Sequence, residues 1–326
     1  MSRHFKTLAS IFLWIIAPTP TIAQSKASPA ETVKAILERP AARLDYLDAA
    51  KTFDGLIDKT SNIPATNAMV ARLVDASRQM AGPNPSDSYK LSAMRQAIYV
   101  AGAWNYNRAF SYDLDDPFGR NIKDRLLSTY VQTRKGNCVS MPALFLIVAD
   151  KIGLDVHLSA APLHLFIRYT DPSGIDHNLE PTSGGHEARA EWMRQHMPMS
   201  DRSIASGFYM RTLTKRETIA EMATTVMDYL LGEHRYQEAI DVADAILAVN
   251  PRDAYTMVKK GSAFAGLLQV EFIDKYPNAA LIPATLQPRY QMLAAANAKA
   301  FKDAEALGWE EPAQEPASPR ASPSRS

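Results

Sequence analysis

The sequence changes its pattern at Gly153, and this change limits the folds open to the chain more than any other feature. Residues 139–152 form an apolar run of helical length that follows a Gly-Asn turn and stops at Gly153. Three short β-like runs come next, at 155–160, 164–169 and 175–180, and the turn sequence Asp-Pro-Ser-Gly separates the last two. We therefore predict an α+β fold in which a buried helix precedes a small antiparallel sheet.

Helical patterns flank this region on both sides. Residues 28–31 (Ser-Pro-Ala-Glu) and residues 214–217 (Thr-Lys-Arg-Glu) are capping boxes, which mark the starts of helices. Before the apolar run, helical patterns predict helices over residues 65–81, 88–110 and 122–133. We expect helical structure in residues 28–112 and again in a tail over residues 214–305.

The hairpin between the last two β-like runs determines which side chains meet. If its turn is centred on Pro172, Tyr169 pairs with Ile175 and His164 pairs with Glu180. Directly paired Cβ atoms lie roughly 4.5–5.5 Å apart, close enough for a carboxylate to hold an imidazole. A slip of two positions keeps both side chains on one face, whereas a slip of one separates them.

Both ends of the chain have the composition of segments outside the folded part. Basic residues precede the apolar stretch 8–17, and a small residue, Ala23, stands where a signal peptidase would cut. We predict a signal peptide over residues 1–23 and a periplasmic or secreted protein, with an uncleaved anchor as the alternative. The tail 310–326 is rich in Pro, Ala and Ser, and we predict that it is disordered.

Charge and composition exclude several classes of function. The net charge of +1 gives no field of one sign that could hold nucleic acid. No later segment is apolar for the roughly 20 residues that a membrane helix needs. The histidines lack close zinc-ligand spacing, and residues 113–116 (Asp-Leu-Asp-Asp) lack the glycine and distal glutamate of a calcium loop, so we expect no metal.

Cys138 is the only cysteine in the chain, so no disulfide can form within it. The Gly-Asn turn places its sulfur at the start of a helix, where the helix dipole favours the thiolate. A thiolate attacks carbonyl carbons, so this position suits a nucleophile. The other interpretation is a small buried apolar residue.

Three segments together resemble the transglutaminase-like superfamily: Gly-Asn-Cys at 136–138, Pro-Leu-His-Leu-Phe-Ile-Arg at 162–168 and Asn-Leu-Glu-Pro-Thr at 178–182. More narrowly, they resemble the SirB-type branch, in which tetratricopeptide-like helices follow the core. The resemblance covers residues 88–265. It implies a papain/transglutaminase-like core over residues 113–205, in which the cysteine helix packs on a small antiparallel sheet.

The resemblance also implies site residues. Cys138 matches the nucleophile, His164 the histidine, and Glu180 the position usually held by aspartate. Many SirB-type relatives have proline in place of the cysteine, but this chain has the thiol. Such a triad performs acyl transfer or hydrolysis at an amide bond of a peptide or protein through a thioester, and it needs no cofactor.

Three further residues are candidates for supporting roles. The backbone N–H of Cys138 and one more donor would hold the oxyanion, and Gln132 and Trp104 are the candidates for that donor. Gln132 is alternatively a solvated helix residue, and Trp104 a core aromatic. Asn178 either assists His164 or hydrogen-bonds the turn.

A second class of function is open for the same fold. Residues 236–240, 246–247 and 250–251 fit the spacing of a tetratricopeptide repeat. The alternative to an enzyme is therefore a catalytically silent scaffold that binds protein or peptide partners through these helices. An enzyme needs an accessible Cys138 with His164 within hydrogen-bond reach, and a scaffold does not.

Overall fold

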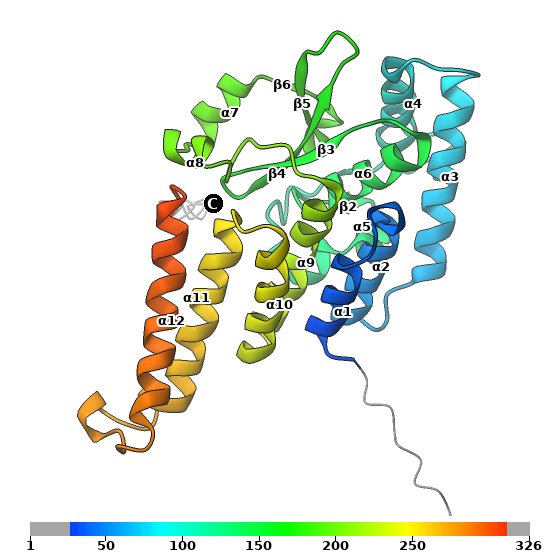
Figure 1. Ribbon diagram of the computed structural model, residues 1–326. Coiled ribbons are helices and arrows are strands. Elements are labelled where there is room, and N and C mark those ends of the chain that lie inside the picture. The colour runs from blue at the N-terminus through cyan, green and yellow to red at the C-terminus, as the bar shows by residue number, and fades with distance from the viewer. Residues whose placement is uncertain (1–26, 312–326) are drawn as a thin grey trace, which may run out of the picture.

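The structure is a computed structural model that describes residues 27–311, apart from the side chains at 190, 192 and 196. A small antiparallel sheet lies at one end of the molecule, with N-terminal helices on one side and C-terminal helices below it (Figure 1). The predicted signal peptide lies outside the described residues, as does all of the predicted disordered tail except residues 310–311.

Four helices form the N-terminal part: α1 (Pro29–Leu37), α2 (Tyr46–Ile57), α3 (Ile63–Ala81) and α4 (Asp87–Tyr99). The predicted capping box of α1 is confirmed, because Ser28 Oγ accepts from Glu31 N at 3.1 Å and Glu31 Oε2 accepts from Ser28 N at 2.7 Å. These bonds satisfy N–H groups that have no partner within the helix.

The helix predicted over residues 88–110 is too long, since α4 ends at Tyr99. Val100 is extended, and a 3₁₀ turn, η2 (Ala103–Asn105), follows. The Asn105 amide folds back on the end of the helix and donates to the carbonyls of Ala97 at 3.1 Å and Val100 at 2.7 Å. This side chain satisfies carbonyls that a continuing helix would have used.

The central segment carries the cysteine turn. It contains β1 (Ser111–Tyr112), η3 (Ile122–Arg125), α5 (Leu127–Thr133), β2 (Lys135–Gly136) and α6 (Ser140–Ile152). The predicted helix 122–133 is thus two pieces that break at Leu126. Strands β1 and β2 form a parallel pair that the sequence did not predict. Helix α6 ends at Gly153 in the left-handed conformation (φ +68°), as predicted.

The sheet consists of β3 (His157–Ala161), β4 (His164–Thr170), β5 (Asp176–Glu180) and β6 (His186–Ala188), in that order and antiparallel. The predicted register is wrong by two positions, because Tyr169 pairs with His177 and not with Ile175. Asp171 explains the shift, since its Oδ1 accepts from Ser173 N and Ile175 N, both at 2.9 Å, and so stabilises a longer loop. A slip of two keeps His164 and Glu180 on one face.

Helices make up the rest of the chain. After η4 (Pro181–Ser183) and β6 come α7 (Ala190–His196), α8 (Asp201–Ala205), α9 (Lys215–Gly232), α10 (Tyr236–Val249), α11 (Ala254–Leu268) and α12 (Gln287–Ala306). A π-helical turn, η5 (Gln269–Ile273), and a 3₁₀ turn, η6 (Ala279–Leu281), join the last two. Helix α9 begins with the predicted capping box at Thr214.

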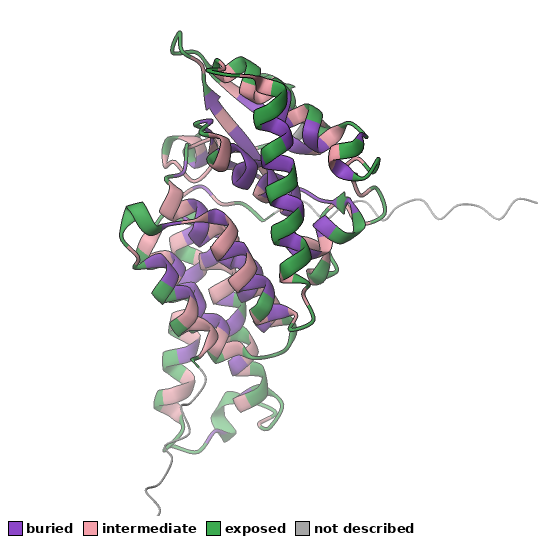
Figure 2. Ribbon diagram, turned by 90° about the vertical axis from the view of Figure 1, so that its right-hand side faces the viewer, coloured by how far each residue is buried: buried purple, intermediate pink, exposed green. Residues whose placement is uncertain are grey.

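Helix α6 lies at the centre of the core. It packs on strands β3 and β4 and on helices α2, α3, α4 and α5. Figure 2 shows buried residues in both strands and helices in the interior of the molecule. Segments far apart in the sequence also meet, because α1 packs on α10 and α2 packs on α9. The two helical parts of the chain therefore share one hydrophobic core.

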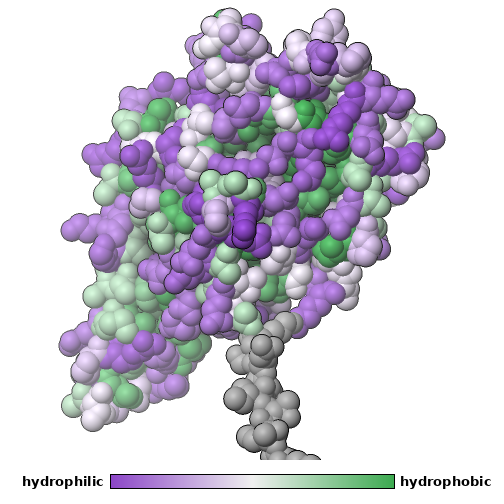
Figure 3. All heavy atoms as spheres, turned by 45° about the vertical axis from the view of Figure 1, so that its right-hand side comes forward, coloured by the Kyte–Doolittle hydropathy of each residue, from purple (hydrophilic) through white to green (hydrophobic). Residues whose placement is uncertain are grey.

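The pair of helices α11 and α12 extends away from this core (Figure 1). Apolar side chains are exposed around its far end, on η5, η6 and the start of α12. In Figure 3, pale green (apolar) atoms gather towards the lower left of the face. The exposed residues are Val270, Ile273, Leu281, Leu286 and Met292. Within residues 27–311, no helix is long and apolar enough to cross a membrane.

Candidate active site

Cys138 lies in a turn that Asn137 holds in place. Asn137 Oδ1 accepts from Val139 N at 3.0 Å and from Ser140 N at 3.1 Å, which is the bonding of a helix cap. The Cys138 side chain is buried, and its thiol lies 3.6 Å from the carbonyl oxygen of Leu163 in the β3–β4 turn. No hydrogen bond from the backbone N–H of Cys138 is found in the described part of the chain.

His164 and Glu180 are in direct contact. His164 Nε2 and Glu180 Oε2 lie 2.6 Å apart, at the start of β4 and the end of β5. The other carboxylate oxygen, Oε1, accepts from Thr182 Oγ1 at 2.7 Å and from Thr182 N at 3.2 Å. With Nε2 used in this way, Nδ1 is the ring nitrogen left for Cys138.

The pKa of His164 reflects both neighbours. Burial lowers this pKa, but hydrogen bonding and charge interactions with Cys138 and Glu180 outweigh the burial and raise it to about 9. The imidazole therefore carries a proton at neutral pH, and an imidazolium stabilises a neighbouring thiolate.

The structure places the three supporting candidates in different surroundings. Trp104 Nε1 donates to the carbonyl of Val100 at 3.2 Å, so its N–H is already used next to its own turn. Gln132 is exposed on α5, and its side chain makes no hydrogen bond to any residue between 27 and 311. Asn178 is buried, and its Oδ1 bonds neither His164 nor the turn. Gln132 and Trp104 thus fit the alternatives given for them, a solvated helix residue and an aromatic packed against the core.

Two tyrosines near the triad were missed from the sequence. Burial raises the pKa of Tyr112, and the charges of Cys138 and Glu180 raise it further, so both charges act on this side chain. Burial and the charge of Glu180 likewise raise the pKa of Tyr99. The parallel pairing of Tyr112 with Gly136 brings the first tyrosine to the site, and no sequence signal marks so short a pair.

The turn after Glu180 is held from outside the sheet. Arg95 on α4 donates through Nε to the carbonyl of Gly184 at 3.0 Å. Gly185 has φ +69°, and a Cβ there would lie 2.8 Å from the Phe145 ring, so only glycine fits. Gly185 N in turn donates to the carbonyl of Glu180 at 2.8 Å. This packing fixes the backbone from which Glu180 reaches His164.

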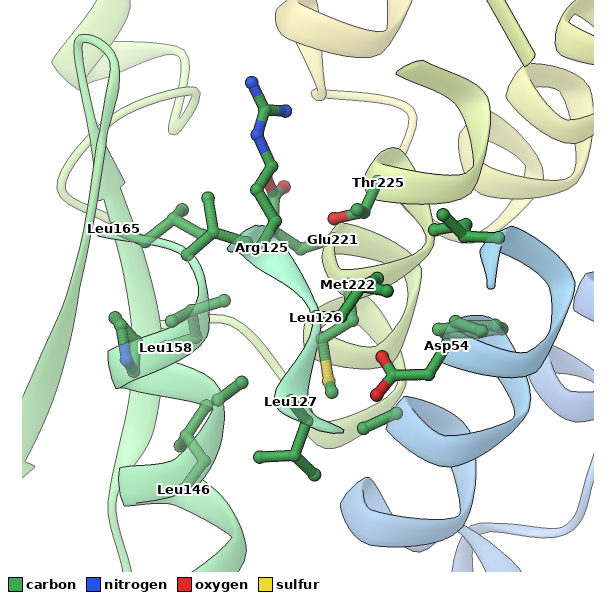
Figure 4. A pocket seen from close by; sticks show the side chains of 16 residues that line it. Asp54, Arg125, Leu126, Leu127, Leu146, Leu158, Leu165, Glu221, Met222 and Thr225 are labelled. Carbon is green, nitrogen blue, oxygen red and sulfur yellow. The ribbon is translucent and has the colours of Figure 1, made fainter. Parts of the chain in front are cut away.

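A mainly apolar pocket lies next to the site (Figure 4). Its wall includes Val139 and Leu165, the sequence neighbours of Cys138 and His164, but not those two residues themselves. Two carboxyl groups also line it. Burial raises the pKa of Asp54 to about 6, and burial together with nearby carboxylates raises that of Glu221 well above its usual range.

The acidic segment 113–116 forms local turns. Asp113 Oδ1 accepts from Asp115 N at 3.0 Å, and Asp116 accepts from the backbone N–H groups of Arg120 at 2.8 Å and Asn121 at 3.0 Å. Within the described residues, no group of three His, Cys, Asp or Glu side chains is placed to hold a metal ion.

Comparison with known proteins agrees with this arrangement. Residues 64–224 match the family model described as the transglutaminase-like superfamily. This segment, which runs from α3 into α9 and contains Cys138, His164 and Glu180, is a transglutaminase-like superfamily domain.

Two relatives show low sequence identity to part of this chain. The UPF0162 protein BU173 of Buchnera aphidicola is 24% identical over 203 residues, which are 60% of this chain and 70% of that protein. The UPF0162 protein YchA of Escherichia coli is 26% identical over 144 residues, 43% of this chain and 53% of YchA. The chain thus matches about half the length of YchA, and neither name states an activity.

Proposed function

We propose that the protein is an exported cysteine enzyme that performs acyl transfer or hydrolysis at amide bonds of peptides or proteins. The observation that carries this proposal is the 2.6 Å contact between His164 Nε2 and Glu180 Oε2, in an imidazole that also interacts with Cys138. A carboxylate in this position holds the ring so that its other nitrogen can exchange a proton with the sulfur.

The proposed reaction has two steps. The proton of Cys138 already rests on His164 at neutral pH, so the thiolate attacks the amide carbonyl carbon, and a C–S bond forms while the C–N bond breaks. The leaving amine takes the proton from His164. Water or a second amine then attacks the thioester, gives its proton to the imidazole and releases the Cys138 thiolate. The backbone N–H of Cys138 supports the oxyanion in both steps.

The Cys138 thiol has two polar neighbours. It lies 3.6 Å from the Leu163 carbonyl oxygen, which is an acceptor for S–H and repels a thiolate, and it also interacts with His164. Formation of the thiolate beside the imidazolium would break the weak contact with Leu163. Leu163 itself is exposed on the turn above the site and has φ +54°, so substrate would meet it first.

A scaffold function is the second candidate. The exposed apolar side chains at the far end of α11 and α12 favour it, as does the low exposure of Cys138. In this proposal the C-terminal helices are tetratricopeptide-like, the chain resembles the SirB-type branch, and the core serves as support for a peptide-binding surface.

The test is labelling of the full chain with iodoacetamide, followed by mass spectrometry of peptide adducts. We expect Cys138 to label at pH 6, where an ordinary thiol with a pKa of about 8.5 is nearly unreactive. Glutamine-containing and cell-wall peptides should then leave an acyl group on Cys138 in the wild type and none in Cys138→Ala.

The control is His164→Gln, which keeps the thiol and removes the proton acceptor. It should label only at alkaline pH. If the wild type also labels only at alkaline pH and gives no adduct with any peptide, the enzyme proposal is wrong and the scaffold proposal stands.

A further inference from the structure

Arg125 bonds both to the loop at Gly119, which lies against the cysteine turn, and to helix α9. Its Nε donates to the carbonyl oxygen of Gly119 at 2.7 Å, and its Nη1 donates to Asp228 Oδ2 on α9, also at 2.7 Å. Most of the guanidinium is buried, with 21% of the side chain exposed. One side chain therefore connects a loop beside the site to a helix 103 positions later in the chain.

At the helical end, Asp228 is shared by three partners. Tyr255 on α11 donates its hydroxyl to Asp228 Oδ2 at 2.6 Å, and Lys259 Nζ lies 3.5 Å from Asp228 Oδ1. Burial and the Asp228 charge raise the pKa of Tyr255, so the hydroxyl stays protonated and remains a donor. Helices α9 and α11 thus fix the carboxylate that holds Arg125.

At the other end, the loop rests directly on the residue before the nucleophile. Gly119 has φ +60°, and a Cβ there would lie 2.6 Å from Asn137 Nδ2 and 2.6 Å from Arg125 Cγ. Asn137 Nδ2 donates to the carbonyl of Asp124 at 2.9 Å, next to Arg125. Asn137 then caps the turn that carries Cys138.

We propose that Arg125 is a positioning residue, through which α9 and α11 hold the Asn137–Cys138 turn so that the sulfur meets His164. The C-terminal helices are then part of the support of the active site. This inference rests on the proposed function. The inference goes further than the proposed function, because it attributes the position of Cys138 to contacts outside the sheet and helix α6.

The experiment measures the rate of Cys138 alkylation by iodoacetamide in the full chain at pH 6 and at pH 9. The variants are Arg125→Lys, which cannot donate to Gly119 and Asp228 in the same forked geometry, and Asp228→Asn, which removes the charge that aligns it. We expect the ratio of the pH 6 rate to the pH 9 rate to fall about tenfold in both, because a sulfur displaced from His164 behaves as an ordinary thiol.

The matched control is Asp244→Asn, which removes an ion pair between α10 and α11 with Lys260, away from Arg125. Its ratio should equal that of the wild type. Tyr255→Phe removes only a hydroxyl from the same network, so it carries the test if the charged variants do not fold. Its ratio should fall about threefold, the equivalent of one ordinary hydrogen bond near the low end of its usual range, because the Arg125–Asp228 ion pair remains.

Two outcomes would overturn the proposal in distinguishable ways. If the wild type labels at pH 6 and the Arg125, Asp228 and Tyr255 variants keep its ratio while remaining folded, the positioning role is wrong and the proposed function survives. If the wild type does not label at pH 6, the proposed function fails and this inference fails with it.

Discussion

Glu180 holds His164 with one carboxylate oxygen and is itself held by the other. Thr182 occupies Oε1 through both its hydroxyl and its backbone N–H, which leaves Oε2 directed at the imidazole. A glutamate has one more rotatable bond than an aspartate, and this anchoring removes the freedom that the bond adds. Anchored in this way, Glu180 can orient the His164 imidazole as an aspartate would.

The raised pKa of His164 predicts a pH-dependent stability. A histidine whose pKa is about 9 in the folded protein and 6.5 in the unfolded chain stabilises the fold fully below pH 6.5. This contribution is lost as the pH rises through 9. Since only 16% of the side chain is exposed, we expect the free energy of unfolding to fall by up to about 3 kcal/mol between pH 6 and pH 10.

Urea denaturation at several pH values measures this effect. Glu180→Gln removes the charge that raises the His164 pKa, so its stability should vary less over the same range. Equal pH dependence in the wild type and the variant would contradict the assignment.

At the scale of elements, helix caps could be predicted from the sequence, but the length of α4 and the register of the hairpin could not. The starts of α1 and α9 and the end of α6 follow from short local signals, and the structure confirms them. The end of α4 depends on Asn105, which folds back from outside the helix, and the hairpin register depends on the bonds of one Asp171 oxygen. Such contacts are chosen among several that the sequence permits, so pattern alone does not fix them.

The candidate site shows the same division. Cys138, His164 and Glu180 could be selected as candidates because each stands in a recognisable segment. Tyr112 was missed because it reaches the site through a two-residue parallel pairing that follows from the tertiary fold.

Alanine substitutions at two glycines should change the free energy of unfolding in opposite directions. Gly153 ends α6 at φ +68°, and a Cβ there would meet no atom within 4 Å, so Gly153→Ala should cost about 1 kcal/mol through backbone strain alone. Gly55 lies within α2 and also has open space around it, so Gly55→Ala should stabilise by about 0.5 kcal/mol. Urea denaturation at constant pH measures both, and effects of the same sign would contradict this account.

At the scale of the whole molecule, the family segment is smaller than the folding unit. Residues 64–224 leave out α1, α2 and all of α10 to α12. Yet α1 packs on α10, α2 packs on α9 and α6, and the same hydrophobic core includes residues from all of these helices. The superfamily domain therefore relies on flanking helices for much of its apolar burial.

A fragment of residues 64–224 should consequently not fold by itself. We expect it to show no cooperative thermal transition by circular dichroism, because it exposes the apolar surfaces of α6 and α9 that α2 and α10 cover. A fragment of residues 27–311 serves as the control and should melt in one transition. A sharp transition in the shorter fragment would show that the flanking helices are dispensable.

The packing of α1 on α10 has a consequence for how the protein is made. A ribosome releases the first helix about 200 residues before it releases the helix that covers it. Until then, the part of α1 that α10 covers lacks its native partner, and the nascent chain remains open to chaperones and proteases. Completion of the native state therefore waits until residue 249 has left the exit tunnel, and substitutions that weaken this late contact should lower yield in cells more than they lower the activity of the molecules that fold.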